Sequence, residues 1–441
     1  MNLNREIVRL SVPAIVSNVT VPLLGLVDTA IAGHLGSGRY LAAMVLGSSM
    51  LNMVFWLFGF LRMGTSGLSA QAYGASDDRA LREVFTRSFL LACLAGVLTL
   101  ACSRPLCALL LRVLAPESDC AAEAAGYYMT CVWGAPALLA TMSVSGWLLG
   151  MQNTFWPMVI AISVNVINIL TSVLLVYGFG FGFEGVALGT ACANWAGLLL
   201  ALVIARRFRR GAPLWCAPGA VFRGGMLWRF FRINTDIFFR SACVMAVSLG
   251  VTAFGARLGD TTLAANGVMM QFFVLFSYFM DGFAFTGEAL CGRFAGAGDA
   301  LMLRRAVRAL LLWSAGTAVF FTLLYLFASR PIATLLTDAA DVLAEVGRMR
   351  WWVVAIPPVT VAAFIFDGVF IGLTATRRML AVTATAAAVF FGTCLLAPSL
   401  RGGTTDNALL WTAFLAYLFT RGALLAMLTP GLLRKHGPLI N

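Results

Sequence analysis

Long apolar runs separated by short polar segments extend over almost the whole chain. A helix of about 20 residues rises roughly 1.5 Å per residue and can cross the ~30 Å apolar core of a bilayer. Twelve runs reach that length, near residues 11–33, 41–64, 85–110, 125–150, 156–179, 184–206, 235–257, 263–287, 307–329, 350–373, 379–398 and 406–429. The pattern predicts an all-α integral membrane protein with twelve transmembrane helices.

The twelve runs form two matching halves. We expect an N-terminal six-helix bundle over 1–206, a cytoplasmic linker over 207–232 and a C-terminal six-helix bundle over 233–441. An internal repeat supports this division: Pro136, Gly146 and Gly150 lie opposite Pro358, Gly368 and Gly372, each 222 residues on. Six spans separate the copies, so both have the same orientation. A pseudo-two-fold axis along the membrane normal should relate them, as in many transporters.

Composition agrees with a membrane protein. The 441 residues are 60% hydrophobic and only 11% charged, whereas soluble domains carry about 25% charged residues. If the N-terminus is cytoplasmic, the cytoplasmic segments hold 20 Arg and Lys residues and the outer segments hold 8. Basic residues are enriched in cytoplasmic loops, so we expect both termini to be cytoplasmic. We expect the chain to span the inner membrane of the cell. The net charge of +12 therefore reflects membrane topology, and we expect no nucleic-acid partner.

Cysteine and histidine show no metal or disulfide pattern. The ten cysteines lie mostly in apolar runs without a CxxC pair, and the two histidines, His34 and His436, are far apart. We expect no bound metal cofactor and no disulfide framework.

The first apolar run carries a single acid, Asp28, with Pro22 six residues earlier. An ionised carboxylate at membrane depth is costly and is usually functional. Pro22 removes a backbone donor and should bend the helix. Asp28 is therefore a candidate proton or sodium site, and the alternative is a structural acid bonded to neighbouring hydroxyls.

Several motifs are similar to one transporter family. They are NVTVPLLGLVDTAIAGHLG (Asn18–Gly36), FLRMGTSGLSAQAYGA (Phe60–Ala75), WLLGMQ (Trp147–Gln152), ARLG (Ala256–Gly259), DGFAF (Asp281–Phe285) and DGVFIG (Asp367–Gly372). The chain resembles the multidrug and toxic compound extrusion (MATE) family, in its DNA-damage-inducible F (DinF) branch. The resemblance implies two six-helix bundles around a central cleft. It also implies a secondary antiporter that exports organic cations, drugs or toxic amphipathic metabolites in exchange for H⁺ or Na⁺.

The resemblance also assigns residues to the coupling site. Asp28 matches the acid of the first helix, which titrates during transport in this branch, and Asn168 and Thr190 match polar positions of the fifth and sixth helices. Ser172 departs from the family, which commonly has Asp there, so Na⁺ at Asp28 would meet one carboxylate and neutral oxygens. Two weaker candidates belong to the same bundle: Asn165 and Ser145.

The C-terminal half has its own polar residues. Asp281 and Glu288 are two turns apart on one face of the eighth run, and Asp367 lies deep in the tenth. We consider Asp281 and Asp367 as secondary ion or substrate sites, because charged groups within a bilayer pair or line water. Asp236 and Arg240 have the i, i+4 spacing of an intrahelical ion pair.

Two other functions are alternatives to an antiporter: a flippase and a membrane enzyme. A lipid or lipid-linked precursor flippase could share the two-bundle architecture. A membrane enzyme is disfavoured, since HExxH, GxSxG and DDxxD-type signatures are all absent, and no ATP-binding motif occurs, so an ion gradient must drive transport. We expect a monomeric, non-enzymatic transporter whose partners are small organic molecules and membrane lipids.

Overall fold

The computed structural model describes residues 2–33, 38–114, 118–209, 212–221, 224–400 and 406–435, and within these ranges the chain is helical without a β-strand. Eleven helices of the described residues are long and apolar enough to cross a membrane. The first helix, α1 (Leu3–Gly33), is 31 residues long and is not one of these eleven. Each predicted run overlaps one of these helices, which confirms the all-α membrane fold.

The chain forms two compact units. The N-terminal unit is Val16–Asn234, and the C-terminal unit is Thr235–Asn441 together with Met1–Ile15. The first residues of α1 join the C-terminal unit through a hydrogen bond of 2.8 Å between the Ser11 and Thr286 hydroxyls.

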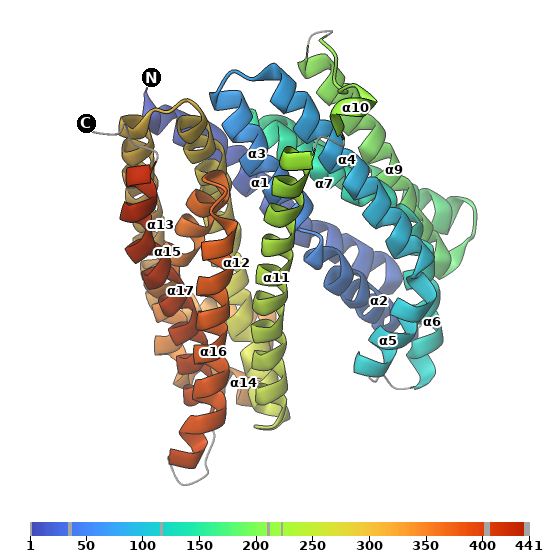
Figure 1. Ribbon diagram of the computed structural model, residues 1–441. Helices are drawn as coiled ribbons and strands as arrows, with labels where there is room; N and C mark the ends of the chain where they lie inside the picture. Colours follow the sequence, from blue (N-terminus) through green and yellow to red (C-terminus); the bar gives the residue numbers. More distant parts are fainter. Residues whose placement is uncertain are drawn as a thin grey trace. The chain divides into compact units, whose positions relative to one another are not determined.

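The N-terminal unit holds most of α1 and the elements up to the start of α11, drawn in blue to green in Figure 1. They are α2 (Gly38–Leu57), α3 (Phe60–Gly74), α4 (Asp78–Ala101), α5 (Ser103–Leu114), α6 (Ser118–Cys131), the 3₁₀ turn η1 (Val132–Gly134), α7 (Ala135–Gly150), α8 (Phe155–Val173), the π turn η2 (Leu174–Gly178), α9 (Gly182–Phe208) and α10 (Pro218–Val221). Of the predicted linker 207–232, residues 210–211 and 222–223 lie outside the described residues.

The C-terminal unit contains longer helices, and Figure 1 shows α12, α13, α15 and α17 packed side by side. Its elements are α11 (Gly224–Ala256), which begins in the N-terminal unit, then α12 (Asp260–Gly296), α13 (Ala300–Leu336), α14 (Ala340–Arg348), α15 (Arg350–Gly372), α16 (Thr376–Leu400) and α17 (Asn407–Lys435).

In three places the structure breaks the helix inside a span that the sequence predicted to be continuous. Run 85–110 is divided at Cys102 into α4 and α5, and run 41–64 ends inside α3, which starts after a turn at Gly59. Run 125–150 comprises α6, η1 and α7. In the last case the cause is local: Pro136 lies in the first turn of α7, where its missing N–H costs little, and so favours a new helix start.

The internal repeat extends to the backbone conformation. Asp77 caps α4 by accepting a hydrogen bond of 2.9 Å from the Ala80 amide. Asp299, 222 residues on, caps α13 in the same way from the Met302 amide at 2.9 Å. The same offset joins two pairs of residues with positive φ: Ser76 (54°) with Gly298 (70°), and Gln152 (62°) with Thr374 (52°). The two halves therefore share one helix-and-turn plan.

Matched glycines hold equivalent helices together in both units. A Cβ at Gly146 of α7 would collide with the Arg62 carbonyl of α3, and a Cβ at Gly368 of α15 would collide with the Ala284 carbonyl of α12. One turn later, Gly150 and Gly372 make the same kind of close backbone approach. Small residues at i and i+4 allow this tight packing of membrane helices. The repeat seen in the sequence thus marks a shared helix-packing seam.

Candidate functional site

Asp28 lies in the last part of α1 with its side chain buried. The residue is only 9% exposed, and its Oδ1 has no hydrogen-bond partner among the described residues. Two side chains of α6, Tyr127 and Cys131, are close enough to interact with it electrostatically. No basic residue is among these neighbours, so the carboxylate has neutral surroundings. α1 is helical throughout Leu3–Gly33, so Pro22 does not end it.

Asn168, Ser172 and Thr190 form a hydrogen-bond network between α8 and α9. The Asn168 amide nitrogen donates to the Thr190 hydroxyl at 2.9 Å, and the Ser172 hydroxyl donates to the Asn168 carbonyl oxygen at a long 3.4 Å. Thr190 in turn donates to the Val186 carbonyl at 3.2 Å. Asn168 and Ser172 are one helical turn apart, so their spacing in the sequence already placed them on one face.

Cys131 links this network to Asp28. Its thiol donates a hydrogen bond of 3.6 Å to the Ala187 carbonyl of α9, and it lies near both the Thr190 hydroxyl and Asp28. The structure therefore brings Asp28, Asn168, Thr190 and Ser172 into one polar region, which we call the Asp28 cluster. In the described part of the chain no hydrogen bond joins Asp28 to the other three residues, and Cys131 is a neighbour of both Asp28 and Thr190.

Tyr127 and Cys131 are members of the Asp28 cluster that the sequence reasoning missed. Tyr127 is 5% exposed, its hydroxyl lies near Ser48 and Cys131, and its ring stacks on Phe183 with centroids 5.6 Å apart. A tyrosine and a cysteine at i and i+4 in an apolar run were the available signal. That signal is weak, because both residue types are common in helix cores.

The other two N-terminal candidates have different surroundings. Asn165 donates to the Thr20 carbonyl at 3.3 Å and so ties α8 to α1 two turns before Asp28. Ser145 is half-buried on α7, and no contact with the Asp28 cluster is found for it among the described residues.

The C-terminal candidate Asp367 lies between two buried arginines. Its Oδ2 pairs with Arg240 of α11 and with Arg421 of α17, and its Oδ1 accepts from the Arg421 Nε at 3.4 Å. None of the three side chains is more than 9% exposed. We call this trio the ionic cluster. It joins α11, α15 and α17, and Asp236 accepts a hydrogen bond of 2.8 Å from Thr376.

Asp281 and Glu288 of α12 surround the ionic cluster with further negative charge. Both interact electrostatically with Arg240, and Asp281 also with Arg421. Glu288 is 1% exposed. Three acids therefore face two arginines, so the charges nearly balance. In the described part of the chain, no group of three or more His, Cys, Asp or Glu could hold a metal ion.

Comparisons with known proteins identify the class. The MatE family profile matches residues 13–174 and 237–394, which is most of the chain and includes both halves of the repeat. The chain belongs to the MATE family, whose proteins are multi-pass membrane transporters and not enzymes.

Its relatives place it in the DinF branch. DNA damage-inducible protein F of Escherichia coli strain K12 is 37% identical over 423 residues, covering 95% of this chain and 90% of that protein. A probable multidrug resistance protein NorM from Thermotoga maritima is 26% identical over 67% of this chain and 64% of its own length. A crystal structure of a MATE protein in the bent conformation has a TM-score of 0.86 at 17% identity, with 99% and 97% of the two chains covered. This likeness supports the fold.

Proposed function

We propose that the protein is a proton-coupled antiporter that exports organic cations, drugs or toxic amphipathic metabolites across the inner membrane. Both termini would be cytoplasmic, and the transporter would act as a monomer. The printed name of the NorM relative, a multidrug resistance protein, supports the substrate class. The positive-inside pattern of 20 against 8 basic residues supports the orientation.

The observation that carries the proposal is the uncompensated acid Asp28. Its carboxyl group is buried, its Oδ1 has no partner among the described residues, and its neighbours Tyr127 and Cys131 are uncharged. Burying a lone carboxylate costs much free energy, and binding a proton removes that cost. A group of this kind can alternate between a protonated and an ionised state as access changes from one side to the other.

Proton coupling is favoured over sodium coupling by the ligands around Asp28. A bound metal ion needs several oxygens directed at one point, and carboxylates supply most of the charge. Here the Asn168 amide nitrogen, the Thr190 hydroxyl and the Ser172 hydroxyl bond to one another or to backbone. Ser172 also supplies no second carboxylate. A proton requires only Asp28 itself.

Asp367 is a weaker candidate for the coupling site. Its carboxylate already has two arginine partners, so protonation would leave Arg240 and Arg421 with less compensation. We therefore assign ion coupling to the Asp28 cluster and a structural role to the ionic cluster.

Efflux of a fluorescent organic cation from proteoliposomes tests the proposal. An imposed pH gradient and an imposed Na⁺ gradient are compared for wild type, Asp28→Asn and the matched control Ser145→Ala. We expect pH-driven efflux in wild type and in the control, and loss of more than 10-fold in Asp28→Asn. Asp28→Glu, which keeps an acid, should retain part of the activity and shows that the site tolerates substitution.

Three results would overturn the proposal. Sodium-driven efflux that survives Asp28→Asn would move coupling away from Asp28. Equal pH-driven efflux in Asp28→Asn and wild type would make Asp28 structural. Absence of efflux under both gradients, with transbilayer movement of labelled lipids in the same vesicles, would favour the flippase.

A further inference from the structure

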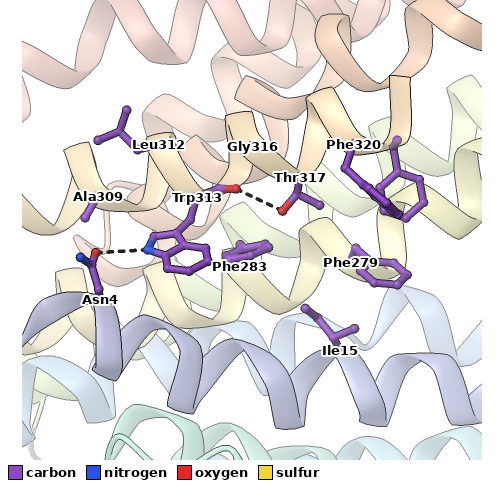
Figure 2. A pocket seen from close by; sticks show the side chains of 11 residues that line it. Asn4, Ile15, Phe279, Phe283, Ala309, Leu312, Trp313, Gly316, Thr317 and Phe320 are labelled. Atoms are coloured by element: carbon purple, nitrogen blue, oxygen red, sulfur yellow. Dashed lines mark hydrogen bonds between the residues drawn. The ribbon is translucent and has the colours of Figure 1, made fainter. Parts of the chain in front are cut away.

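A groove on the C-terminal unit lies between the start of α1, α12 and α13. Its volume is about 650 Å³, within the ~300–1,000 Å³ typical of ligand pockets. Figure 2 shows Ile15, Phe279, Phe283 and Phe320 around it. At one end the Trp313 indole donates a hydrogen bond of 3.2 Å to the Asn4 side chain, also drawn in Figure 2. The groove is therefore apolar along its length and polar at one end.

The outer wall of the groove has the character of a lipid-facing surface. On α13, Leu312 is 66% exposed and Phe320 is 61% exposed, which is unfavourable in water and normal against acyl chains. A Cβ added at Gly316, between them, would meet nothing within 4 Å, so the floor is open there. The side chains that line the groove would suit an extended hydrocarbon chain.

Arginines mark the polar end. The residues of α13 that line the groove follow helical spacing, and the same stripe continues one turn earlier to Arg305 and Arg308. Both are exposed and have no ion pair within the described residues. Arg5 of α1, next to Asn4, is a third such arginine.

The nearby acids already have partners. Asp299 caps α13 through the Met302 amide, at 2.9 Å, and Glu6 pairs with Arg9 at 3.1 Å. The Met302 amide does not neutralise the Asp299 carboxylate, but Arg5, Arg305 and Arg308 outnumber this one acid, so excess positive charge at this end of the groove is left for an external anion.

We propose that this groove binds one anionic phospholipid of the cytoplasmic leaflet, with its phosphate at Arg305 and Arg308 and one acyl chain along Phe279, Gly316 and Phe320. The positive charge of the arginines selects an anionic headgroup, and the apolar groove binds the acyl chain. Trp313, bonded to Asn4, lies at the boundary between them, where tryptophan is favoured in membranes. The choice of the cytoplasmic leaflet rests on the proposed orientation, with both termini inside, whereas the site itself does not depend on the direction or substrate of transport.

Native mass spectrometry of the purified full-length protein tests this site, with phosphatidylglycerol and phosphatidylcholine as probes. We expect one phosphatidylglycerol to bind at least 10-fold more tightly than phosphatidylcholine. Arg305→Gln/Arg308→Gln should remove this preference, a loss of about 10- to 30-fold from two near-surface charges. Arg206→Gln/Arg207→Gln, an exposed pair in the N-terminal unit, has the same loss of charge and should keep it.

A second measurement locates the acyl chain. Gly316→Leu fills the groove and should weaken binding of both lipids, whereas Gly267→Leu, also in open space, should not. Phosphatidylglycerol with brominated chains should quench less tryptophan fluorescence in Trp313→Phe than in wild type. Equal affinity of the wild type for both lipids, or an equal loss in the two arginine double variants, would overturn the proposal.

Discussion

The two units place buried acids in opposite electrostatic surroundings. In the N-terminal unit, Asp28 has uncharged neighbours and an unbonded Oδ1 within the described residues. In the C-terminal unit, Asp367 has two arginines, Arg240 and Arg421. An uncompensated acid favours taking up a proton, whereas an acid between two arginines favours staying ionised. The same fold thus holds one acid suited to change its charge and one suited to keep it.

The repeat shows how this difference arises. The 222-residue offset that matches Gly146 with Gly368 also places Ser145 opposite Asp367, and Ser66 opposite Glu288. These two acidic positions of the C-terminal unit are therefore hydroxyls in the N-terminal unit, whereas Asp281 lies opposite Gly59. The packing seam is common to both halves, and the two acids beside it are present in only one of them.

The largest expected effect comes from removing the acid between the two arginines. Asp367→Asn breaks both ion pairs of the ionic cluster, and losing one partner of a buried ion pair costs about 3–5 kcal/mol. Asp281 and Glu288 still compensate the arginines in part, so this range is an upper bound. We expect a marked fall in the apparent melting temperature in detergent and in the yield of monodisperse protein. Ser145→Ala, at the matching position, should change stability by less than about 0.5 kcal/mol.

The triple variant Arg240→Met/Asp367→Leu/Arg421→Met separates charge from packing in the same experiment. Replacing a whole buried ion network by apolar residues is often neutral, but here Asp281 and Glu288 lose their arginine neighbours, so only part of the stability should return. A triple variant as unstable as Asp367→Asn would contradict our account of the ionic cluster.

The sequence predicted the spans and the repeat because both depend on local pattern. Apolar runs of spanning length and matched prolines and glycines are visible without any contact information. The helix break at Cys102 was missed although the sequence marks it, because Ser103, Arg104 and Pro105 follow Cys102 directly and were read as part of one span.

The sequence predicted which candidate site residues share a face of one helix, but not which residues of different helices meet. Asn168 and Ser172 share a face by spacing, but the link to Asp28 through Cys131 requires α6 to pack beside α1 and α9. Arg240 and Asp367 are 127 residues apart in sequence, so no periodicity could join them. The i, i+4 spacing instead favoured Asp236 as the partner of Arg240.

Glycine substitutions test whether the packing seam is equivalent in both units. Gly146→Ala and Gly368→Ala each force a Cβ into a backbone carbonyl, so each should destabilise by about 1–3 kcal/mol. Thermal unfolding of the two variants should show similar losses. Gly267→Ala, where an added Cβ meets nothing, should be neutral or slightly stabilising. A loss confined to one variant would show that the units pack differently.

Asn168→Ala tests the role of the uncharged hydrogen-bond network in the N-terminal unit. It removes the 2.9 Å bond to Thr190 and the acceptor of Ser172, and a typical buried hydrogen bond contributes about 0.5–1.5 kcal/mol. We expect a stability loss of that size and a several-fold reduction in pH-driven efflux. Stability loss without any change in efflux would remove Asn168 from the coupling site.

Ser172→Ala should have the smallest effect. Ser172 donates to Asn168 at 3.4 Å, near the limit for a hydrogen bond, so its loss should cost at most about 0.5 kcal/mol. Its hydroxyl also packs closely against Gly189 of α9, and alanine leaves only the space of that one oxygen atom unfilled. pH-driven efflux should therefore be nearly unchanged, measured beside Asn168→Ala in the same vesicles. A loss as large as that of Asn168→Ala would mean that the Ser172 hydroxyl takes part in coupling, and that Asp28 does not act as a lone acid.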